Sequence, residues 1–259
     1  MKKIIIASIF TVIYQAYAIF GIGGHIGVDN TSVDSESITA FSINMAGVDY
    51  SYGLSSDEIK NPLALGAQLY LDIPVVPIGF EVGFEGAWAS YNWKGSNVLT
   101  HPTDSAQNLP LQFTGYDYPA SEYDEEFDFA KIGVDITAKW YVFSLPPVVK
   151  TAKFYVGGGV GFYFITPVVS EELIRYELEK RYADYPDITP GTEIAFDVDE
   201  YIEKVTVMGF HFVAGAQVKF PVMPLSFNVD YKYVSTPEND YGDDTNKFGV
   251  IKGSINFYI

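Results

Sequence analysis

The sequence has no cysteine, few basic residues and no long apolar run beyond its first residues. Without cysteine, the chain cannot form a disulfide framework, use a thiol nucleophile or bind zinc through thiolates. Only 16 Lys and Arg stand against 33 Asp and Glu among 259 residues, which gives a formal net charge of −17. Nucleic acid is excluded as a partner, because phosphate binding needs a positive surface. Aromatic residues make up 16% of the chain, which excludes wholesale disorder.

The start of the chain has the pattern of a secretory signal peptide. Two lysines precede the apolar run Ile4–Ile13, and Ala16-Tyr17-Ala18 follows as a cleavage site. The run is too short to cross a bilayer, which takes about 20 residues. We therefore predict a signal peptide over residues 1–18, cleaved near Ala18, and a single domain over residues 19–259. An uncleaved anchor is the alternative.

The rest of the chain alternates between apolar and polar residues, as strands do when their two faces meet different surroundings. In Leu225–Val234, for example, the odd-numbered residues are all apolar, and the even-numbered ones are polar up to Lys232. No later stretch has 18 consecutive apolar residues, so no transmembrane helix is expected. Eight segments show the alternation, and they cover about 19–28, 62–73, 78–90, 131–143, 153–164, 204–220, 225–234 and 247–259.

Short and long connectors also alternate along the chain. The short ones, 74–77, 144–151 and 221–224, contain proline, which suits turns because it cannot donate to a strand ladder. The long ones are 29–61, 93–126, 166–202 and 237–246. This layout predicts an all-β fold, an eight-stranded antiparallel up-and-down transmembrane β-barrel with long acidic loops at one end.

A lipocalin-like soluble barrel, with its apolar face turned inward around a ligand, is the architectural alternative. Two features of the polar face favour the membrane barrel. The polar face carries many glycines, such as Gly66, Gly83 and Gly159, which suit a crowded interior better than a wet exterior. Its charges nearly balance, as buried charges must. We predict that these charges form an ion-pair network in the lumen: Asp72, Glu81, Glu85, Asp135 and Asp230 with Lys131, Lys139, Lys153, Lys219, Lys232 and Lys252.

With a signal peptide and eight alternating segments, the chain resembles the OmpA/OmpX-type small barrels of the outer-membrane β-barrel superfamily, over essentially its whole mature length. The resemblance implies a porin-like protein in the outer membrane of a Gram-negative bacterium, in contact with lipid and lipopolysaccharide. It also implies insertion by the barrel-assembly machinery, which reads a terminal aromatic residue. Here Phe257 lies two residues before the final Ile259, which departs from that pattern.

Several functions fit such a barrel, and we predict a structural or surface-interaction role with a plugged lumen. A narrow channel for small solutes is the first alternative. A lipid A-modifying enzyme that uses histidine as a base is the second. His25 and His211 fall on the inward face and His101 falls in a long connector, but none has a nucleophile at a recognisable spacing. The sequence therefore predicts no catalytic residue. An extracellular ligand is a further possibility, but nothing in the sequence identifies it.

The four long connectors carry most of the negative charge, with 26 acidic and 5 basic residues. Carboxylate oxygens can bind Ca²⁺ or Mg²⁺, although no spacing matches an EF-hand and a solvated, repulsive surface is the favoured interpretation. No other cofactor is expected. The candidate ion-binding residues are Asp124, Glu125, Glu126, Asp197, Asp199, Glu200, Asp240, Asp243 and Asp244.

Three smaller features complete the expectations. Ser170–Tyr185 predicts a short helix in the third long connector, capped by Ser170. Its apolar stripe is expected to pack on the barrel rim rather than against a foreign partner. The apolar stretch Ile38–Met45 is expected either to extend the sheet or to fold inward as a lid. Trp88, Tyr91 and Trp93 are expected at the outer membrane interface and Trp140 at the inner one.

Overall fold

The computed structural model describes residues 19–45, 47–73, 76–113, 122–145, 152–182, 194–196, 206–220, 223–237 and 246–258. The predicted signal peptide lies outside these residues, so it stays a prediction, as does the single domain over 19–259. No helix within the described residues is long and apolar enough to cross a membrane.

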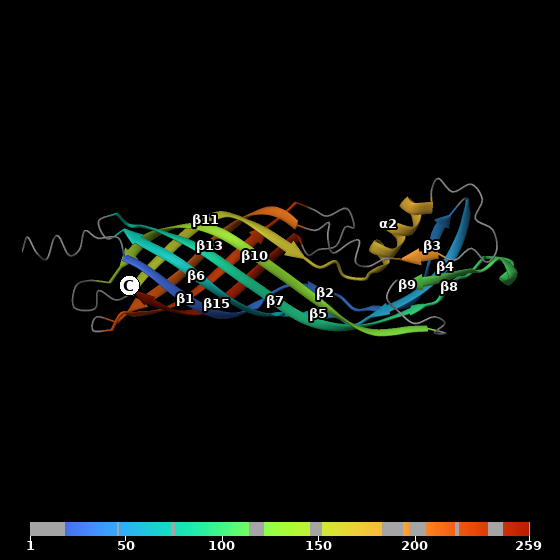
Figure 1. Ribbon diagram of the computed structural model, residues 1–259, viewed down its shortest axis with the longest axis horizontal. Coiled ribbons are helices and arrows are strands. Elements are labelled where there is room, and N and C mark those ends of the chain that lie inside the picture. The colour runs from blue at the N-terminus through green and yellow to red at the C-terminus, as the bar shows by residue number, and fades with distance from the viewer. Residues whose placement is uncertain are drawn as a thin grey trace, which may run out of the picture.

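Eight antiparallel strands close into a barrel (Figure 1). They follow one another around the wall in chain order, and β10 closes the ring by pairing with β7 on one side and β11 on the other. The closed, all-β architecture predicted from the alternation is therefore confirmed. The barrel strands are β1 (Ile19–Asp29), β6 (Leu63–Ile73), β7 (Ile78–Ser96), β10 (Glu122–Ser144), β11 (Ala152–Ile165), β13 (Thr206–Lys219), β14 (Leu225–Ser235) and β15 (Lys247–Tyr258).

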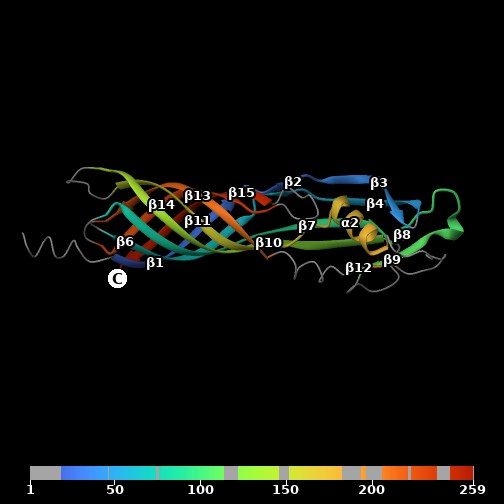
Figure 2. The ribbon, with the colours of Figure 1, turned by 90° about the horizontal axis from the view of Figure 1, so that it is seen from above.

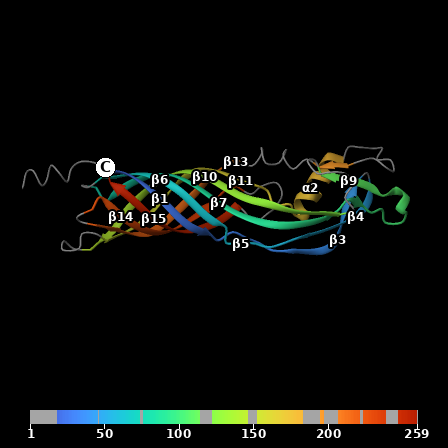
Figure 3. The same cartoon turned by 60° about the horizontal axis from the view of Figure 1, so that its bottom comes forward.

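The two ends of the barrel differ. The start of β1 and the end of β15 lie at the same end as the strand ends that the three short connectors join, and we call this the short-turn end (Figure 1). At the other end, β7 and β10 continue far beyond the remaining strands (Figures 2 and 3). Their pairing runs without a break from Trp140↔Ile78 to Glu122↔Ser96.

The outer wall of the barrel is apolar and its interior is polar. On the outer face, Phe162 is 62% exposed, Phe212 69% and Val229 62%. On the inner face, Asp135 of β10 and Lys232 of β14 are buried. In water, such a wall would expose far more contiguous apolar surface than soluble proteins carry. The outward apolar face contradicts the lipocalin-like alternative, in which these side chains would line the cavity.

The extended strands carry a second folded unit, which we call the distal module. β3 and β4 form a hairpin, and β4 pairs with the extended part of β7 through Leu54↔Gly95 and Ser56↔Trp93. The remaining elements lie beside this sheet, beyond the end of the barrel and on the right in Figure 1. The module comprises the ends of β7 and β10 with β3 (Glu36–Met45), β4 (Val48–Ser56), β8 (Val98–Leu99), η1 (Ser105–Gln107), β9 (Leu109–Phe113), α2 (Glu171–Tyr182) and β12 (Ile194–Phe196); β2 (Ser32–Val33) and β5 (Ile59–Lys60) pair between it and the barrel.

The polarity of the strands inverts where the barrel ends and the distal module begins. Along β7, the outward residues are apolar up to Trp88 and then become polar, beginning with Ser90 and Asn92. The inward residues change in the opposite sense, from Glu85 to Tyr91 and Trp93. β10 shows the same inversion between its charged lumen residues and Phe129. One strand thus has a lipid-facing section and a water-facing section with opposite patterns.

This inversion corrects part of the predicted aromatic girdle. Tyr91 is 3% exposed and Trp93 is 1% exposed, so both belong to the core of the distal module and not to the membrane interface. Trp88 and Trp140 do lie on the outer wall, at 44% and 59% exposure. The prediction went wrong because it treated each tryptophan and tyrosine near a strand end as outward, although residues an odd number apart face opposite sides of a strand.

The apolar stretch Ile38–Met45 extends the sheet, the first of the two expectations for it. Phe41, Ile43 and Met45 of β3 are buried in the module core, and Ser42 and Asn44 face outward. The first long connector is therefore largely a folded hairpin. Its core side chains are buried by the same apolar effect that stabilises soluble domains.

The predicted helix forms as α2, over Glu171–Tyr182, and residues 183–185 lie outside the described chain. The Ser170 hydroxyl accepts the Leu173 N–H at 3.3 Å, as a capping residue does. The apolar stripe of α2 packs on β3 rather than on the barrel rim, and its residues Ile174 and Leu178 are fully buried. Burial raises the pKa of Glu36 on β3, whose carboxylate accepts the Glu171 N–H.

Candidate functional site: the polar lumen

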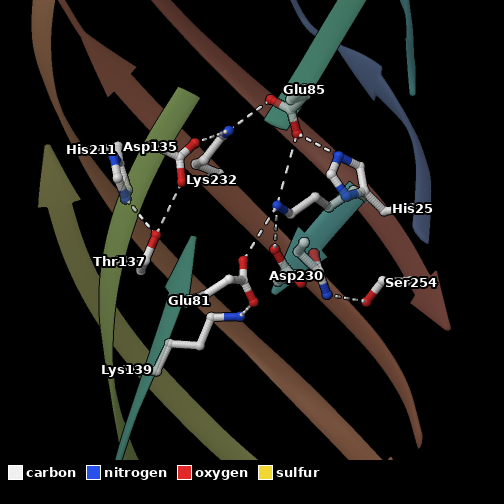
Figure 4. Close-up of polar contacts among 12 residues, drawn as sticks. His25, Glu81, Glu85, Asp135, Thr137, Lys139, His211, Asp230, Lys232 and Ser254 are labelled. Atoms are coloured by element: carbon white, nitrogen blue, oxygen red, sulfur yellow. Dashed lines mark hydrogen bonds and ion pairs between the residues drawn. The ribbon is translucent and has the colours of Figure 1, made fainter. Parts of the chain in front are cut away.

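A cluster of alternating charges fills the middle of the lumen (Figure 4). Lys232 of β14 lies between two carboxylates, with its Nζ 2.7 Å from Glu85 Oε1 and 3.0 Å from Asp135 Oδ2. Lys139 of β10 contacts Glu81 of β7 at 2.5 Å. All of these side chains are at least nine-tenths buried. Because each buried charge has an opposite charge within hydrogen-bonding distance, the desolvation cost is offset.

Longer contacts connect this cluster to the short-turn end. Lys252 Nζ lies 3.8 Å from Asp230 and Glu85 and 3.9 Å from Glu81. Close to the short-turn end of the lumen, Asp72 accepts a hydrogen bond from Lys219 at 2.6 Å. Lys153 lies 3.9 Å from the same carboxylate, and the Tyr141 hydroxyl also donates to it.

Lys131 completes the predicted set, and its partner is a residue that the sequence analysis did not include. Its Nζ contacts Asp29 Oδ2 at 3.2 Å, donates to Thr31, and lies 3.6 Å from the ring centroid of Phe248. Asp29 had been assigned to the first acidic connector, but it is the last residue of β1 and is 1% exposed. The alternation could have found it, because Asp29 continues the inward series of His25 and Gly27.

With Asp29 included, the described lumen charges balance. The network holds six carboxylates (Asp29, Asp72, Glu81, Glu85, Asp135 and Asp230) and six ammonium groups (Lys131, Lys139, Lys153, Lys219, Lys232 and Lys252). This balance is expected, because an unpaired charge inside a low-dielectric wall would carry a large desolvation cost. The excess negative charge of the chain therefore lies outside the lumen.

Glycines beside the charges let the long side chains fit. Glu85 lies between Gly66 and Gly133 on its neighbouring strands, and Asp135 lies between two further glycines. A Cβ atom at Gly66 would come within 2.3 Å of His25 Nε2, which is 3.1 Å from Glu85 Oε2. The glycines expected on the polar face thus occupy the space where ion pairs cross from strand to strand.

Both inward histidines have partners inside the lumen. His211 Nε2 lies 2.7 Å from Thr137 Oγ1, and its Nδ1 lies 3.2 Å from the Tyr163 hydroxyl. The sequence analysis missed Thr137, because the pair comes from two strands that are not adjacent in the barrel. His211 is 1% exposed and Thr137 is 2% exposed, so the pair is enclosed by the lumen packing. A hydroxyl beside an imidazole resembles an activated nucleophile, but burial of this kind favours a packing role.

His101 lies in the distal module. Its Nδ1 accepts the backbone N–H groups of Thr103 and Asp104 at 3.3 and 3.1 Å, which fixes the turn before η1. Its ring meets the Tyr50 ring edge-on, with centroids 5.6 Å apart. These contacts describe a structural role for His101.

The lower lumen, toward the short-turn end, contains neutral polar groups and little free space. Gln68 Nε2 donates to Asn256 Oδ1 at 2.7 Å, and the Tyr155 hydroxyl donates to Asp230 at 2.9 Å. A cavity of about 10 Å³ lies next to Gln217 and Asn228. That is room for about one water molecule. At the opposite end, Phe248 and Phe129 form an apolar layer above Lys131. Side chains therefore occupy the lumen at its middle and at both ends of the described barrel.

The candidate divalent-ion residues fall in two groups. Asp124, Glu125 and Glu126 lie in strand β10 and pair with Lys94, Trp93 and Asn92 of β7, so they are not part of a loop. Among the described residues, no three His, Asp or Glu side chains are grouped as a metal ion would require. The remaining candidates, Asp197, Asp199, Glu200, Asp240, Asp243 and Asp244, lie outside the described residues, and ion binding there stays a prediction.

An apolar outer wall around a neutralised polar lumen decides the class of barrel. The fold is a transmembrane β-barrel. No known family model matches the sequence, and no curated protein does either. Among solved structures, the barrel is similar to neisserial surface protein A, with a TM-score of 0.43, 9% identity, and coverage of 93% of this chain and 98% of that one.

Two other solved barrels are similar over comparable lengths. The Yersinia pestis outer membrane protein Ail gives a TM-score of 0.36 at 12% identity, over 92% of this chain and 99% of that one. The N-terminal β-barrel domain of Pseudomonas aeruginosa OprF gives 0.31 at 10% identity, over 92% and 97%. These are distant likenesses, and the assignment of the barrel rests on the strand pairing and surface of this chain.

Proposed function

We propose that the chain is an outer-membrane protein of a Gram-negative bacterium, in which a closed barrel anchors the distal module at the cell surface. Its role is structural or one of surface interaction, without catalysis or solute conduction. The observation that carries this proposal is the inversion of polarity along β7 and β10. A lipid-facing section and a water-facing section on the same strands support a module that lies immediately outside the membrane.

The orientation follows from the two ends of the barrel. In outer-membrane barrels the short turns face the periplasm and the long connections face outward. The short-turn end, which carries both termini of the barrel, would therefore be periplasmic, and the distal module extracellular. The wall would contact phospholipid and lipopolysaccharide, and the barrel-assembly machinery would insert it. The acidic connectors would repel other anions and keep the exposed end soluble.

The filled lumen supports the absence of conduction. Ion pairs cross the lumen in its middle, and an apolar layer closes it beneath the distal module. A conducting pore needs a continuous water-filled path, and the cavity beside Gln217 and Asn228 in the lower lumen holds only about one water molecule. The buried His211 and Thr137 pair, which a lipid substrate would have to reach through the wall, likewise supports a protein without enzyme activity.

Cell fractionation with protease shaving of intact cells tests the proposal. We expect the protein in the outer-membrane fraction, with heat-modifiable migration on gels and cleavage only in the distal module and its connectors. Reconstituted into planar bilayers, the protein should give no reproducible conductance steps. Recovery in the soluble periplasm would contradict the membrane location, and steady steps would restore the channel alternative.

A further inference from the structure

A groove interrupts the apolar wall near the short-turn end. Its volume is about 680 Å³, which lies within the usual range for small-ligand sites, roughly 300–1,000 Å³. It begins at the turn between β6 and β7 and crosses the outer faces of β10, β11 and β13. The lining residues are Val76, Pro77, Ile78, Ala138, Lys139, Trp140, Val156, Gly157 and Phe212.

The groove has a low floor at Ala138, a small outward residue of β10. Most other outward positions of these strands hold large side chains, and the partner of Ala138 on β11 is Gly158, against which the Phe212 ring lies. Two neighbouring strand pairs contribute the rest of the lining. Trp140 of β10 pairs with Val156 of β11, and Gly158 of β11 pairs with Phe212 of β13. Trp140 and Phe212, at 59% and 69% exposure, are the two large aromatic side chains that line the groove.

We propose that this groove binds one acyl chain of a phospholipid from the leaflet at the short-turn end. The proposal rests on the membrane location proposed above. The groove is continuous with the lipid-facing wall, so bilayer lipid is the substance that meets it. A second barrel is the less suitable occupant, because its convex wall would touch the protruding Trp140 and Phe212 before it reached the floor. A single flexible chain can lie beside them.

The charges around the groove indicate which part of the lipid is recognised. Among the described lining residues, Lys139 alone is charged, and its ammonium points into the lumen, where it contacts Glu81 at 2.5 Å. None of the described lining groups is therefore free to pair with a phosphate. Recognition would depend on apolar contact with the chain, so zwitterionic and anionic phospholipids should bind equally.

Quenching of Trp140 by phospholipid brominated on its acyl chains tests this proposal. The barrel would be refolded into vesicles as the Trp88→Phe variant, which leaves Trp140 as the lipid-facing tryptophan and Trp93 buried in the distal module. With brominated lipid as a minority component, we expect the fluorescence of Trp140 to be quenched more than the mole fraction of brominated lipid alone would give. Phosphatidylethanolamine and phosphatidylglycerol carriers of the bromine should act alike.

Two further variants change the groove, and one serves as a matched control. Ala138→Phe fills the floor and Phe212→Ala removes one of the two large aromatic side chains, and each should abolish the excess quenching. Ala67→Phe makes the same addition on the outer face of β6, away from the groove, and should leave the excess unchanged. Quenching at the random level in the parent, or equal excess in all variants, would overturn the proposal. Absence of any quenching in fully brominated vesicles would instead overturn the membrane location.

Discussion

Replacement of Lys232 by methionine is expected to lower the free energy of unfolding by about 3–5 kcal/mol, because it leaves buried carboxylates without their counter-charge. Lys232 Nζ is the shared partner of Glu85 and Asp135, and its side chain is 3% exposed. In the variant, Glu85 would keep His25 and a more distant Lys252, while Asp135 would keep the hydrogen bond from the Thr137 hydroxyl but no ammonium partner among the described residues. The measurement is urea-induced unfolding in lipid vesicles, followed by tryptophan fluorescence.

The controls separate the charge effect from the loss of side-chain volume. Lys232→Met combined with Asp135→Asn removes one charge of each sign and should recover part of the lost stability, because the remaining described lumen charges again balance and Asp135 no longer leaves a carboxylate without its counter-charge. Lys60→Met removes an exposed lysine that pairs with the exposed Glu58 and should leave the unfolding midpoint unchanged. If Lys232→Met unfolds at the same urea concentration as Lys60→Met, the ion-pair account of the lumen is wrong.

Replacement of Trp93 by alanine should destabilise the distal module while the barrel stays folded. Trp93 is 1% exposed, and its ring meets that of Phe127 edge-on. Removal of such a side chain from a core costs about 3–5 kcal/mol. Trp93 belongs to the module core, beyond the point where the polarity of β7 inverts. We expect faster hydrogen exchange in β3, β4 and α2, and unchanged heat-modifiable migration of the barrel.

Trp88→Ala is the matched control for this prediction. Trp88 lies five residues earlier on the same strand but on the outer wall, where lipid replaces the lost contacts. It should leave exchange in the distal module unchanged. Equal protection of the module in both variants would mean that Trp93 contributes nothing to a module core. Loss of the folded barrel in Trp93→Ala would mean that the barrel and the module are one cooperative unit.

The barrel could be predicted from the sequence because each of its strands lies between two media. Lipid on one side and a polar interior on the other impose strict alternation, as in Leu225–Val234. The charges of opposite sign on one face then indicate a closed lumen, and the structure brings all of the predicted lysines next to acidic partners. The three short connectors predict that the segments they join are antiparallel neighbours, and the structure confirms these pairings.

The distal module could not be predicted in the same way, because its strands continue those of the barrel with the pattern inverted. The alternation of β7 never breaks; only the identity of the apolar face changes after Trp88. Segment boundaries drawn at the change in pattern therefore ended the strands too early and left Tyr91 and Trp93 misplaced. The contact between His211 and Thr137 was missed for another reason, since it joins strands that are close only across the lumen.

The central claim is that β7 passes from lipid into water between Trp88 and Ser90. The chain has no cysteine, so single-cysteine variants at Phe80, Phe84, Trp88, Ser90, Asn92 and Lys94 can each carry one nitroxide on the outward face. In vesicles, we predict that the labels up to residue 88 are reached by oxygen dissolved in the bilayer, and that those from residue 90 onward are reached by a water-soluble nickel chelate. Access of the nickel chelate to all six positions would contradict the account.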